Sequence, residues 1–314
     1  MKNSLIACLL LLAALCACNQ HATPQKRIAI LTPVSHPSLE QIEKGFVQTL
    51  QAAHPERYRF DIFNAQGNKT LMRSEIEEII RGDYELVFTL GTTASQMAIE
   101  VFGKKGLTTP VVFTCVNDPV GFHIAASEKS SGNMATGVRE IVDFQKEILY
   151  LLQYKPEIKR LLLVYNPTEP GLGKDQQELF RLSQERHIEL TTVEVFQTNE
   201  LMAKVQPFIT KTDAVIVLKD NTVICGIDAL VKLCNRYQVP LIASDLDSPD
   251  KGAAFGYGVH EVDFGIEAAH KALLILDEGM QPKEIPITPV SQFTLRINEE
   301  AALKQGVAYD RLHP

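Results

Sequence analysis

Short runs of apolar, mostly β-branched residues alternate with longer segments of helical period along most of this chain. Strands that alternate with helices are typical of a parallel sheet, because the chain must cross back over the sheet between one strand and the next. The sequence therefore predicts an α/β protein. The runs expected to form strands cover residues 28–31, 60–63, 86–89, 111–113, 161–164, 190–193, 214–218, 241–243 and 253–255.

The clearest helical pattern covers residues 222–237. Its apolar residues recur three and four positions apart, which places them on one buried face of a helix. These residues are Val223, Ile227, Leu230, Cys234 and Tyr237. A second clear helix is expected over residues 264–278, just before a glycine.

The chain is long enough for two lobes, each with its own core. A polar, turn-rich stretch at 127–137 separates two series of strands and helices, and we expect the first crossing between lobes there. The predicted first lobe covers 27–137 plus about 256–282, and the second covers 138–255 plus about 283–314. Beyond the N-terminal segment the sequence has no apolar run that could span a membrane, which excludes a channel within this chain.

The N-terminal segment has the pattern of an export signal. Lys2 precedes an apolar run over 5–15, which is too short to cross a bilayer, and Cys18 follows a small residue. The pattern predicts a signal peptide over 1–17 and a lipid-anchored tether over 18–26, with acyl chains on Cys18 holding the protein to the bacterial cell envelope outside the cytoplasm. The alternative is an ordinary signal peptide with incidental cysteines.

Charge and cysteine usage exclude some partners and pairings. The formal net charge is −7 and no basic run is present, so nucleic acid is not expected as a partner. Beyond the tether the cysteines are Cys115, Cys225 and Cys234, so at least one thiol stays free. The spacing of Cys225 and Cys234 on one predicted helix puts them on opposite faces, and buried small apolar residues are the favoured interpretation.

Compact polar clusters follow nearly every predicted strand. In doubly wound sheets ligands bind beyond the carboxyl ends of the strands, although Ser, Thr, Asp or Asn at such a position is also a good helix N-cap. Capping alone does not require Asp220 and Asp245 at two exits of one sheet, nor Asn117-Asp118 before a proline. The clusters occupy residues 32–36, 91–93, 114–119, 166–168, 219–222 and 244–245.

Two of these clusters suit the two ends of a zwitterion. Gly91, Thr92 and Thr93 open a predicted helix, whose free N–H groups and positive dipole end favour a carboxylate. Asp220 and Asp245 favour an ammonium group. Other residues expected to line the cleft are Ser35, Thr114, Asn117, Asn166, Asn221 and Tyr257.

Asp220 and its neighbour Lys219 leave alternatives open. Asp220 is equally well placed to be the N-cap of the helix that follows it. Lys219 lies directly before it, where a cation either pairs with Asp220 or meets an acidic group of the ligand.

Catalytic and metal-binding motifs are not found. The chain has no G-x-S-x-G or H-E-x-x-H pattern, and its eight histidines lack the spacing of metal ligands. Residues 171–174 are too short for a phosphate loop, and Asp175 stands where the hydroxyl residue would follow. The sequence therefore predicts a protein that is not an enzyme and needs neither cofactor nor metal.

Several strand exits and loops carry a family pattern: His36-Pro37-Ser38-Leu39, Asn64-Ala65-Gln66-Gly67-Asn68, Val112-Phe113-Thr114, Asp118-Pro119-Val120-Gly121, Gly132-Asn133, Thr136-Gly137-Val138, Tyr165-Asn166-Pro167 and Asp220-Asn221-Thr222-Val223. In these residues the chain resembles the ABC-transporter substrate-binding lipoprotein family, some members of which bind aromatic amino acids. The resemblance implies a type I periplasmic-binding fold, with two Rossmann-like lobes of parallel sheets joined by a hinge. It also implies delivery of a small molecule to an ABC permease.

The chain departs from that family at positions near the expected ligand. Lys219 and Asn117 stand where the family tends to have threonine, and Thr93-Ala94-Ser95 replaces a Pro-Ala-Ala run. The chain has no tryptophan, which leaves Phe and Tyr for stacking on a ring. The identity of the family's ligands is therefore not carried over.

The leading hypothesis is a lipid-anchored receptor for an amino acid or a similar small zwitterion. A sensor or scaffold that signals to another membrane protein is the alternative. An exported hydrolase ranks last, because its one candidate pair, Ser35 and His36, is adjacent in a loop, where side chains rarely face one another.

Overall fold

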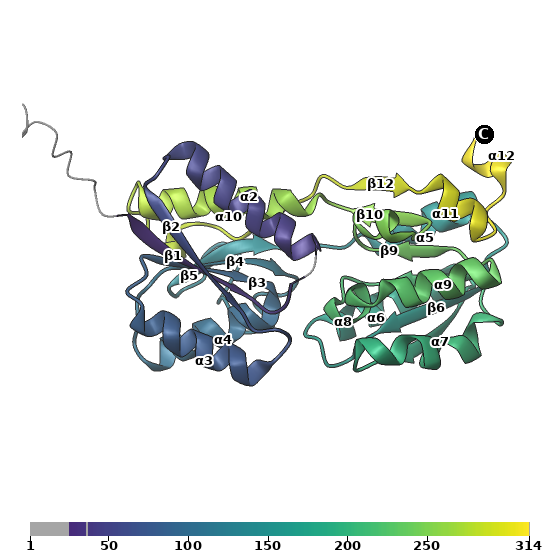
Figure 1. Ribbon diagram of the computed structural model, residues 1–314, viewed down its shortest axis with the longest axis horizontal. Helices are drawn as coiled ribbons and strands as arrows, with labels where there is room; N and C mark the ends of the chain where they lie inside the picture. Colours follow the sequence, from purple (N-terminus) through teal and green to yellow (C-terminus); the bar gives the residue numbers. More distant parts are fainter. Residues whose placement is uncertain (1–24, 36, 314) are drawn as a thin grey trace, which may run out of the picture.

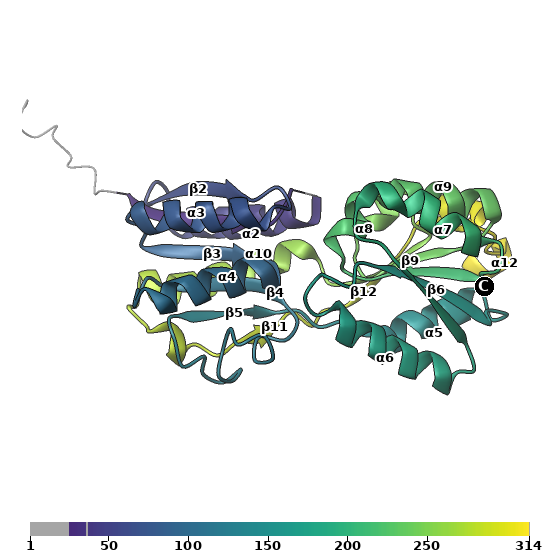
Figure 2. The same cartoon turned by 90° about the horizontal axis from the view of Figure 1, so that it is seen from below.

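The computed structural model describes residues 25–35 and 37–313. They form two lobes that lie end to end, each a sheet covered by helices on both faces (Figures 1 and 2). The predicted signal peptide, Cys18 and most of the predicted tether lie outside the described residues, as does His36.

The first lobe contains a six-stranded sheet whose neighbouring strands all run parallel. Its strands alternate in the faces they present, so that Ile28 and Ile30 join one core cluster while Ala29 and Leu31 join the other. Strands buried on both faces are expected to read as continuous apolar runs. In spatial order the strands are β11 (Thr288–Pro289), β5 (Ala135–Arg139), β4 (Val111–Val116), β3 (Leu86–Leu90), β1 (Lys26–Thr32) and β2 (Tyr58–Asn64).

Helices cover both faces of this first sheet. On one face lie α2 (Pro37–Ala53) and α10 (Glu261–Leu276), with Phe46 of α2 stacked on Phe88 of the sheet at 3.9 Å between ring centroids. On the other face lie α3 (Lys69–Arg81) and α4 (Gly91–Lys104). The lobe is completed by the short helix η3 (Pro282–Glu284), which contacts β5.

The second lobe repeats this plan with one reversed edge strand. Its sheet contains, in spatial order, β12 (Thr294–Ile297), β10 (Phe255–Gly258), β9 (Leu241–Ala243), β8 (Ala214–Val217), β6 (Arg160–Tyr165) and β7 (Glu189–Glu194). Only β12 pairs antiparallel among these described strands.

Two groups of helices cover the second sheet. One face carries α7 (Leu201–Ile209), α8 (Asn221–Cys225) and α9 (Ile227–Tyr237), and the other carries α5 (Phe144–Tyr154) and α6 (Leu172–Glu185). The remaining short elements are η1 (Thr198–Glu200), η2 (Ser248–Lys251), α11 (Glu299–Lys304) and α12 (Tyr309–Leu312). No helix in the described part of the chain is both long and apolar enough to cross a membrane.

The chain passes between the lobes at 140–143, 259–260 and 290–293. The first two segments lie a few residues from the predicted boundaries, whereas the third lies well beyond the predicted change of lobe at about 282–283. Strand pairing is the reason: β5 continues to Arg139 in the first sheet, residues 256–258 belong to β10 of the second, and β11 at 288–289 pairs with β5 of the first. The return of the chain after β10 places α10 back on the first lobe.

The predicted helix over 222–237 is two helices, because α8 ends and α9 begins at Gly226. A Cβ there would lie 2.5 Å from the side chains of Leu201 and Thr198, so the neighbouring segment approaches the backbone closely. Cys225 and Cys234 therefore sit on different helices. Cys234 is buried as predicted, whereas the prediction for Cys225 is wrong, since it ends a short helix at the surface and is exposed. Both thiols are free, as is that of Cys115.

Close contact between α2 and α10 provides a test of the first lobe's packing. Gly265 of α10 lies against α2, where a Cβ would be 2.7 Å from the backbone nitrogen of Phe46 and would overlap the carbonyl of Ile42. We expect Gly265→Ala to lower the free energy of unfolding by about 1–3 kcal/mol, because the two helices must move apart.

Gly103 of α4 is the matched control. A Cβ there meets no described atom within 4 Å, so Gly103→Ala should leave stability unchanged or raise it by up to ~1 kcal/mol. Urea denaturation of both variants measures the difference. Equal effects of the two substitutions would contradict the close contact.

Candidate ligand-binding site between the lobes

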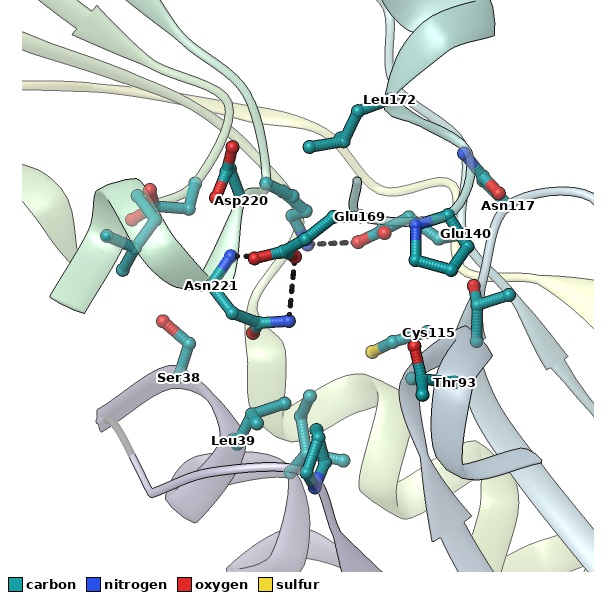
Figure 3. A pocket seen from close by; sticks show the side chains of 18 of the residues that line it. Ser38, Leu39, Thr93, Cys115, Asn117, Glu140, Glu169, Leu172, Asp220 and Asn221 are labelled. Atoms are coloured by element: carbon teal, nitrogen blue, oxygen red, sulfur yellow. Dashed lines mark hydrogen bonds and ion pairs between the residues drawn. The ribbon is translucent and has the colours of Figure 1, made fainter. Parts of the chain in front are cut away.

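A cavity lies where the carboxyl ends of the two sheets face one another (Figure 3). The first lobe and its crossing segments contribute Pro33, Ser38, Leu39, Ile42, Gly91, Thr92, Thr93, Cys115, Asn117, Glu140 and Glu261. The second lobe contributes Glu169, Pro170, Leu172, Asp175, Lys219, Asp220, Asn221, Ile224 and Asp245. The cavity thus brings together the predicted residues Gly91, Thr92, Thr93, Asn117, Asp220, Asn221 and Asp245.

The first turn of α4 forms one wall of the cavity. β3 runs directly into this helix, and Gly91 makes the sharp turn with a φ of +78°, a left-handed conformation that favours glycine. No described side chain caps the helix. Its first N–H groups have no partner within the helix, and the dipole adds positive potential there. With the hydroxyls of Thr92 and Thr93, this wall is suited to a carboxylate.

Asp220 lies on the opposite wall and is fully buried. Its carboxylate accepts hydrogen bonds from the backbone N–H groups of Asn166 and, at 3.0 Å, of Val223. It is therefore the N-cap of α8 as well as a lining residue, so both predicted roles fall on one side chain. Burial, together with the charge of nearby Glu169, raises the pKa of Asp220 to about 8.

Asp245 also lines the cavity, but its oxygens are taken by its own loop. One accepts the backbone N–H groups of Asp247 and Ser248, at 2.9 and 2.7 Å, and the other accepts the Ser248 hydroxyl at 2.7 Å. Only 3% of Asp245 is exposed. Its carboxylate therefore holds the start of η2.

Glu169 is a lining residue that the sequence analysis did not single out. Its carboxylate lies over the N-terminus of α8 and accepts four hydrogen bonds, of which those from Asn221 are drawn in Figure 3. Two come from Asn221, at 3.1 and 3.0 Å, and two from Thr222, both at 2.9 Å. Glu169 directly follows the predicted cluster at 166–168, so extending that cluster by one residue would have included it.

Lys219 does not pair with Asp220. Its Nζ lies 2.7 Å from Oε1 of Glu140 and 2.7 Å from Oε1 of Glu261, and 4.8 Å from the ring centroid of Phe264. These three charged side chains are 14%, 12% and 4% exposed. Burial alone would lower the pKa of Lys219, but the two carboxylates outweigh it and hold the pKa well above its usual range.

This cluster joins the two lobes. Lys219 follows β8 of the second lobe, Glu140 lies in the first crossing segment, and Glu261 begins α10 at the second crossing. Burial raises the pKa of Glu261 to about 7 even though Lys219 opposes the rise. The ammonium group of Lys219, which comes from the other lobe, is thus the counter-charge for both carboxylates.

Asp175 lies in the first turn of α6 and has a different environment. Burial raises its pKa to about 7, with a further contribution from the charge of Glu140, while a hydrogen bond from the Asn117 side chain opposes the rise. Asn117 belongs to the first lobe, so this contact crosses the cavity. Gly171, with a φ of +93°, brings the α6 loop against Asn117, because a side chain there would overlap the Asn117 amide.

Some predicted lining residues lie outside this cavity. Ser35 is exposed and accepts a hydrogen bond from the Asn64 amide at 2.7 Å. Thr114 is fully buried and contacts Cys115, while Tyr257 is buried with ring centroids of Tyr150 and Phe293 at 5.2 and 5.4 Å.

Asn166 is buried at the base of α8, where it bonds to Asp220 and Thr222. It lines a neighbouring outer groove together with Gln66 and Phe196. The sequence placed it correctly at a strand exit, but its hydrogen bonds serve the second lobe's own loop.

Among residues 25–35 and 37–313 no group of three histidine, cysteine, aspartate or glutamate side chains is arranged to hold a metal ion. The Ser35 hydroxyl bonds to Asn64, and its proposed partner His36 is outside the described residues.

Two lobes of parallel, helix-covered sheets with a cavity at their facing carboxyl edges define a type I periplasmic-binding protein, which confirms the predicted fold class. The chain belongs to the ABC transporter substrate binding protein family, whose model matches residues 27–312. Members of this family are extracytoplasmic solute-binding proteins and are generally not enzymes.

Individual relatives extend the comparison. The chain is 24% identical to a tyrosine-binding protein of Clostridioides difficile over 279 residues, 88% of this chain and 79% of the relative. It is 28% identical to an uncharacterized protein of Rickettsia prowazekii over 283 residues, 90% of this chain and 86% of the relative. The structure of an ABC domain from Streptococcus pneumonia in complex with L-Trp has a TM-score of 0.84 at 22% identity, covering 92% of this chain and 98% of that one.

The cluster of Lys219, Glu140 and Glu261 predicts a large loss of stability when the lysine ammonium group is removed. Lys219→Met leaves Glu140 and Glu261 buried without a counter-charge, so we expect the free energy of unfolding at pH 8 to fall by about 3 kcal/mol or more. Lys174→Met is the matched control, because Lys174 forms an ion pair with Asp118 between the lobes but is 69% exposed. An exposed pair contributes less than ~1 kcal/mol. Similar losses in both variants, measured by denaturant titration, would contradict the buried cluster.

The raised pKa of Asp175 predicts that the stability of the ligand-free protein depends on pH. A folded-state pKa of about 7, above the unfolded value of 3.8, means that the folded form binds more protons, so the free energy of unfolding falls as pH rises from about 4 to 7. Asp175→Asn should match the parent protein near pH 4, where the carboxyl is largely protonated in both states, and exceed it by more than ~1 kcal/mol at pH 8.

Asp228→Asn, at an exposed position in the first turn of α9, should show no such pH-dependent difference. Thermal unfolding across this pH range measures both variants. If Asp175→Asn is no more stable than the parent at pH 8, burying the ionised Asp175 carboxylate does not lower the stability of the folded protein, and the prediction is wrong.

Proposed function

We propose that this protein is a lipid-anchored receptor that captures a small zwitterion, an amino acid or a similar compound, between its lobes and delivers it to an ABC permease. The observation that carries the proposal is the pair of opposed walls in the cavity. One wall presents the first turn of α4, and the other presents carboxylates from the second lobe.

The two walls match the two ends of such a ligand. Free N–H groups and threonine hydroxyls at the start of α4 would bind a carboxylate. An ammonium group would meet acidic side chains on the facing wall, where charge-assisted hydrogen bonds are short and strong. The relatives that are tyrosine-binding or bound to L-Trp support an amino acid as the ligand class.

Contacts between the lobes support closure around the ligand by a hinge. Gln41 of α2 donates to the Asp247 carboxylate at 2.8 Å, and Lys174 of α6 pairs with Asp118. All three crossing segments lie at the same end of each lobe, so the lobes can rotate about them without unfolding (Figure 1). The anchor on Cys18 is supported by the sequence of the export signal.

A ligand screen tests the proposal. The protein is purified, and compounds that remain bound are identified by mass spectrometry; amino acids, peptides and sugars are then added in a thermal-unfolding assay. A ligand at a hundred times its dissociation constant should stabilise the folded state by about 2.7 kcal/mol. Unchanged melting across the whole panel would contradict a receptor function.

Thr93→Val tests the carboxylate wall. The substitution keeps the shape of the side chain but removes its hydroxyl, so we expect about tenfold weaker binding of the amino acid that the screen identifies, with unchanged unfolding of the free protein. Thr70→Val, in the first turn of α3 and outside the cavity lining, is the control. Calorimetric titration compares the two, and equal affinities would place the ligand carboxylate elsewhere.

A further inference from the structure

We infer that the ligand carries a net positive charge and that Asp175 binds its cationic group. This inference rests on the proposed function and names the ligand class for the same cavity. It follows from a count of which acidic side chains in the lining already have partners.

Three lining carboxylates are occupied by the protein itself. Glu169 accepts four hydrogen bonds from Asn221 and Thr222. Asp220 accepts two backbone N–H groups, and Asp245 accepts two backbone N–H groups and a hydroxyl. These groups cap the loops of the second lobe. Glu140, Glu261 and Asp175 remain, and of these Glu140 and Glu261 already share the ammonium group of Lys219.

Lys219 is the only lysine or arginine among the described lining residues, and it is shared by Glu140 and Glu261 at 2.7 Å each. One positive charge therefore faces two carboxylates before Asp175 is considered. Within the described part of the chain, no lysine, arginine or histidine nitrogen lies within 4 Å of the Asp175 carboxylate. The adjacent Lys174 is directed to Asp118 instead.

Asn117 supplies a second, independent observation on the facing wall. Its amide nitrogen is directed to Asp175, and its Oδ1 is buried with no hydrogen-bond partner among the described residues. The cavity at this point thus offers a carboxylate from one lobe and an amide oxygen from the other. An ammonium or guanidinium group has N–H donors for both acceptors and a charge that opposes that of Asp175.

The ligand class follows from both ends of the cavity. If the start of α4 binds a carboxylate, the α-ammonium group balances it and a further cation reaches Asp175. The compound that matches both ends of the cavity is a basic amino acid. An amine without a carboxylate is a smaller compound of the same cationic class.

The surroundings of Asp175 give this binding a pH dependence. Glu140 from the crossing segment adds negative potential, and Lys174 on its own helix opposes it. Glu147 of α5 also faces this group, but burial raises the pKa of Glu147 well above its usual range and so favours its uncharged form. With its pKa near 7, Asp175 loses a proton when a cation binds. The affinity for a cationic ligand should therefore rise between pH 6 and pH 8.

Matched pairs of ligands of nearly equal shape provide the test. Arginine and citrulline differ in a guanidinium against a neutral ureido group, and lysine and norleucine differ in a terminal ammonium group. At pH 8 we expect the cationic member of at least one pair to bind at least tenfold more tightly than its neutral counterpart in calorimetric titration. At pH 6 the same cationic compound should bind less tightly than it does at pH 8. Equal or tighter binding of the neutral members would overturn the inference.

Variants of Asp175 assign the effect to one side chain. Asp175→Asn should remove the preference for the cationic member and its pH dependence, while Asp175→Glu should keep part of both. Asp228→Asn is the control for a loss of one surface charge. Thermal unfolding without ligand shows that each variant is folded.

The outcomes separate the two proposals. If no amino acid, amine, peptide or sugar binds, the receptor function fails and this inference with it. If a neutral or acidic amino acid binds equally to the parent protein and to Asp175→Asn, the receptor function stands and the assignment of Asp175 is wrong.

Discussion

Burial of the strands on both faces is the constraint on which the rest of this structure depends. Apolar runs such as Ile28–Leu31 need cover above and below, and helices supply it only if the chain crosses over the sheet after each strand. The crossovers make the strands parallel, and parallel strands bring their polar exits to one edge. Two such edges face each other here, and the cavity lies between them (Figure 3).

The position of each acidic residue along the chain determines which groups its carboxylate contacts in that cavity. The acidic residues that follow strands of the second lobe, Glu169, Asp220 and Asp245, bind donors from their own loops. Those at the crossings, Glu140 and Glu261, share Lys219. Asp175, in a helix that faces the other lobe, has neither arrangement. The chain's own hydrogen bonds therefore distinguish the carboxylates that hold loops from Asp175, the carboxylate that we propose binds the ligand.

Much of the fold was predictable from the sequence, and less of the site. Long, periodic apolar patterns identified the strands from Ile28 to Ala243, and strand exits identified Thr92, Thr93 and Asp220. The pattern failed for β5, where glycine and threonine in a turn-rich stretch form a buried strand, and for the polar edge strand β12. Missing β5 hid Glu140 at its exit. The partners of Lys219 and Asp175 lie far from them in the chain, so spacing gave no signal for either contact.

The return of α10 to the first lobe has a consequence for how the chain folds. Residues 261–276 pack beside α2 and against strands from the beginning of the chain, so that lobe lacks part of its core until more than two hundred residues have been added after α2. The second lobe's sheet is already nearly complete by then, except for β12. Contacts this distant in sequence close late and slowly, so the N-terminal lobe, although its strands emerge first, reaches its final form only after most of the second lobe's sheet has been added.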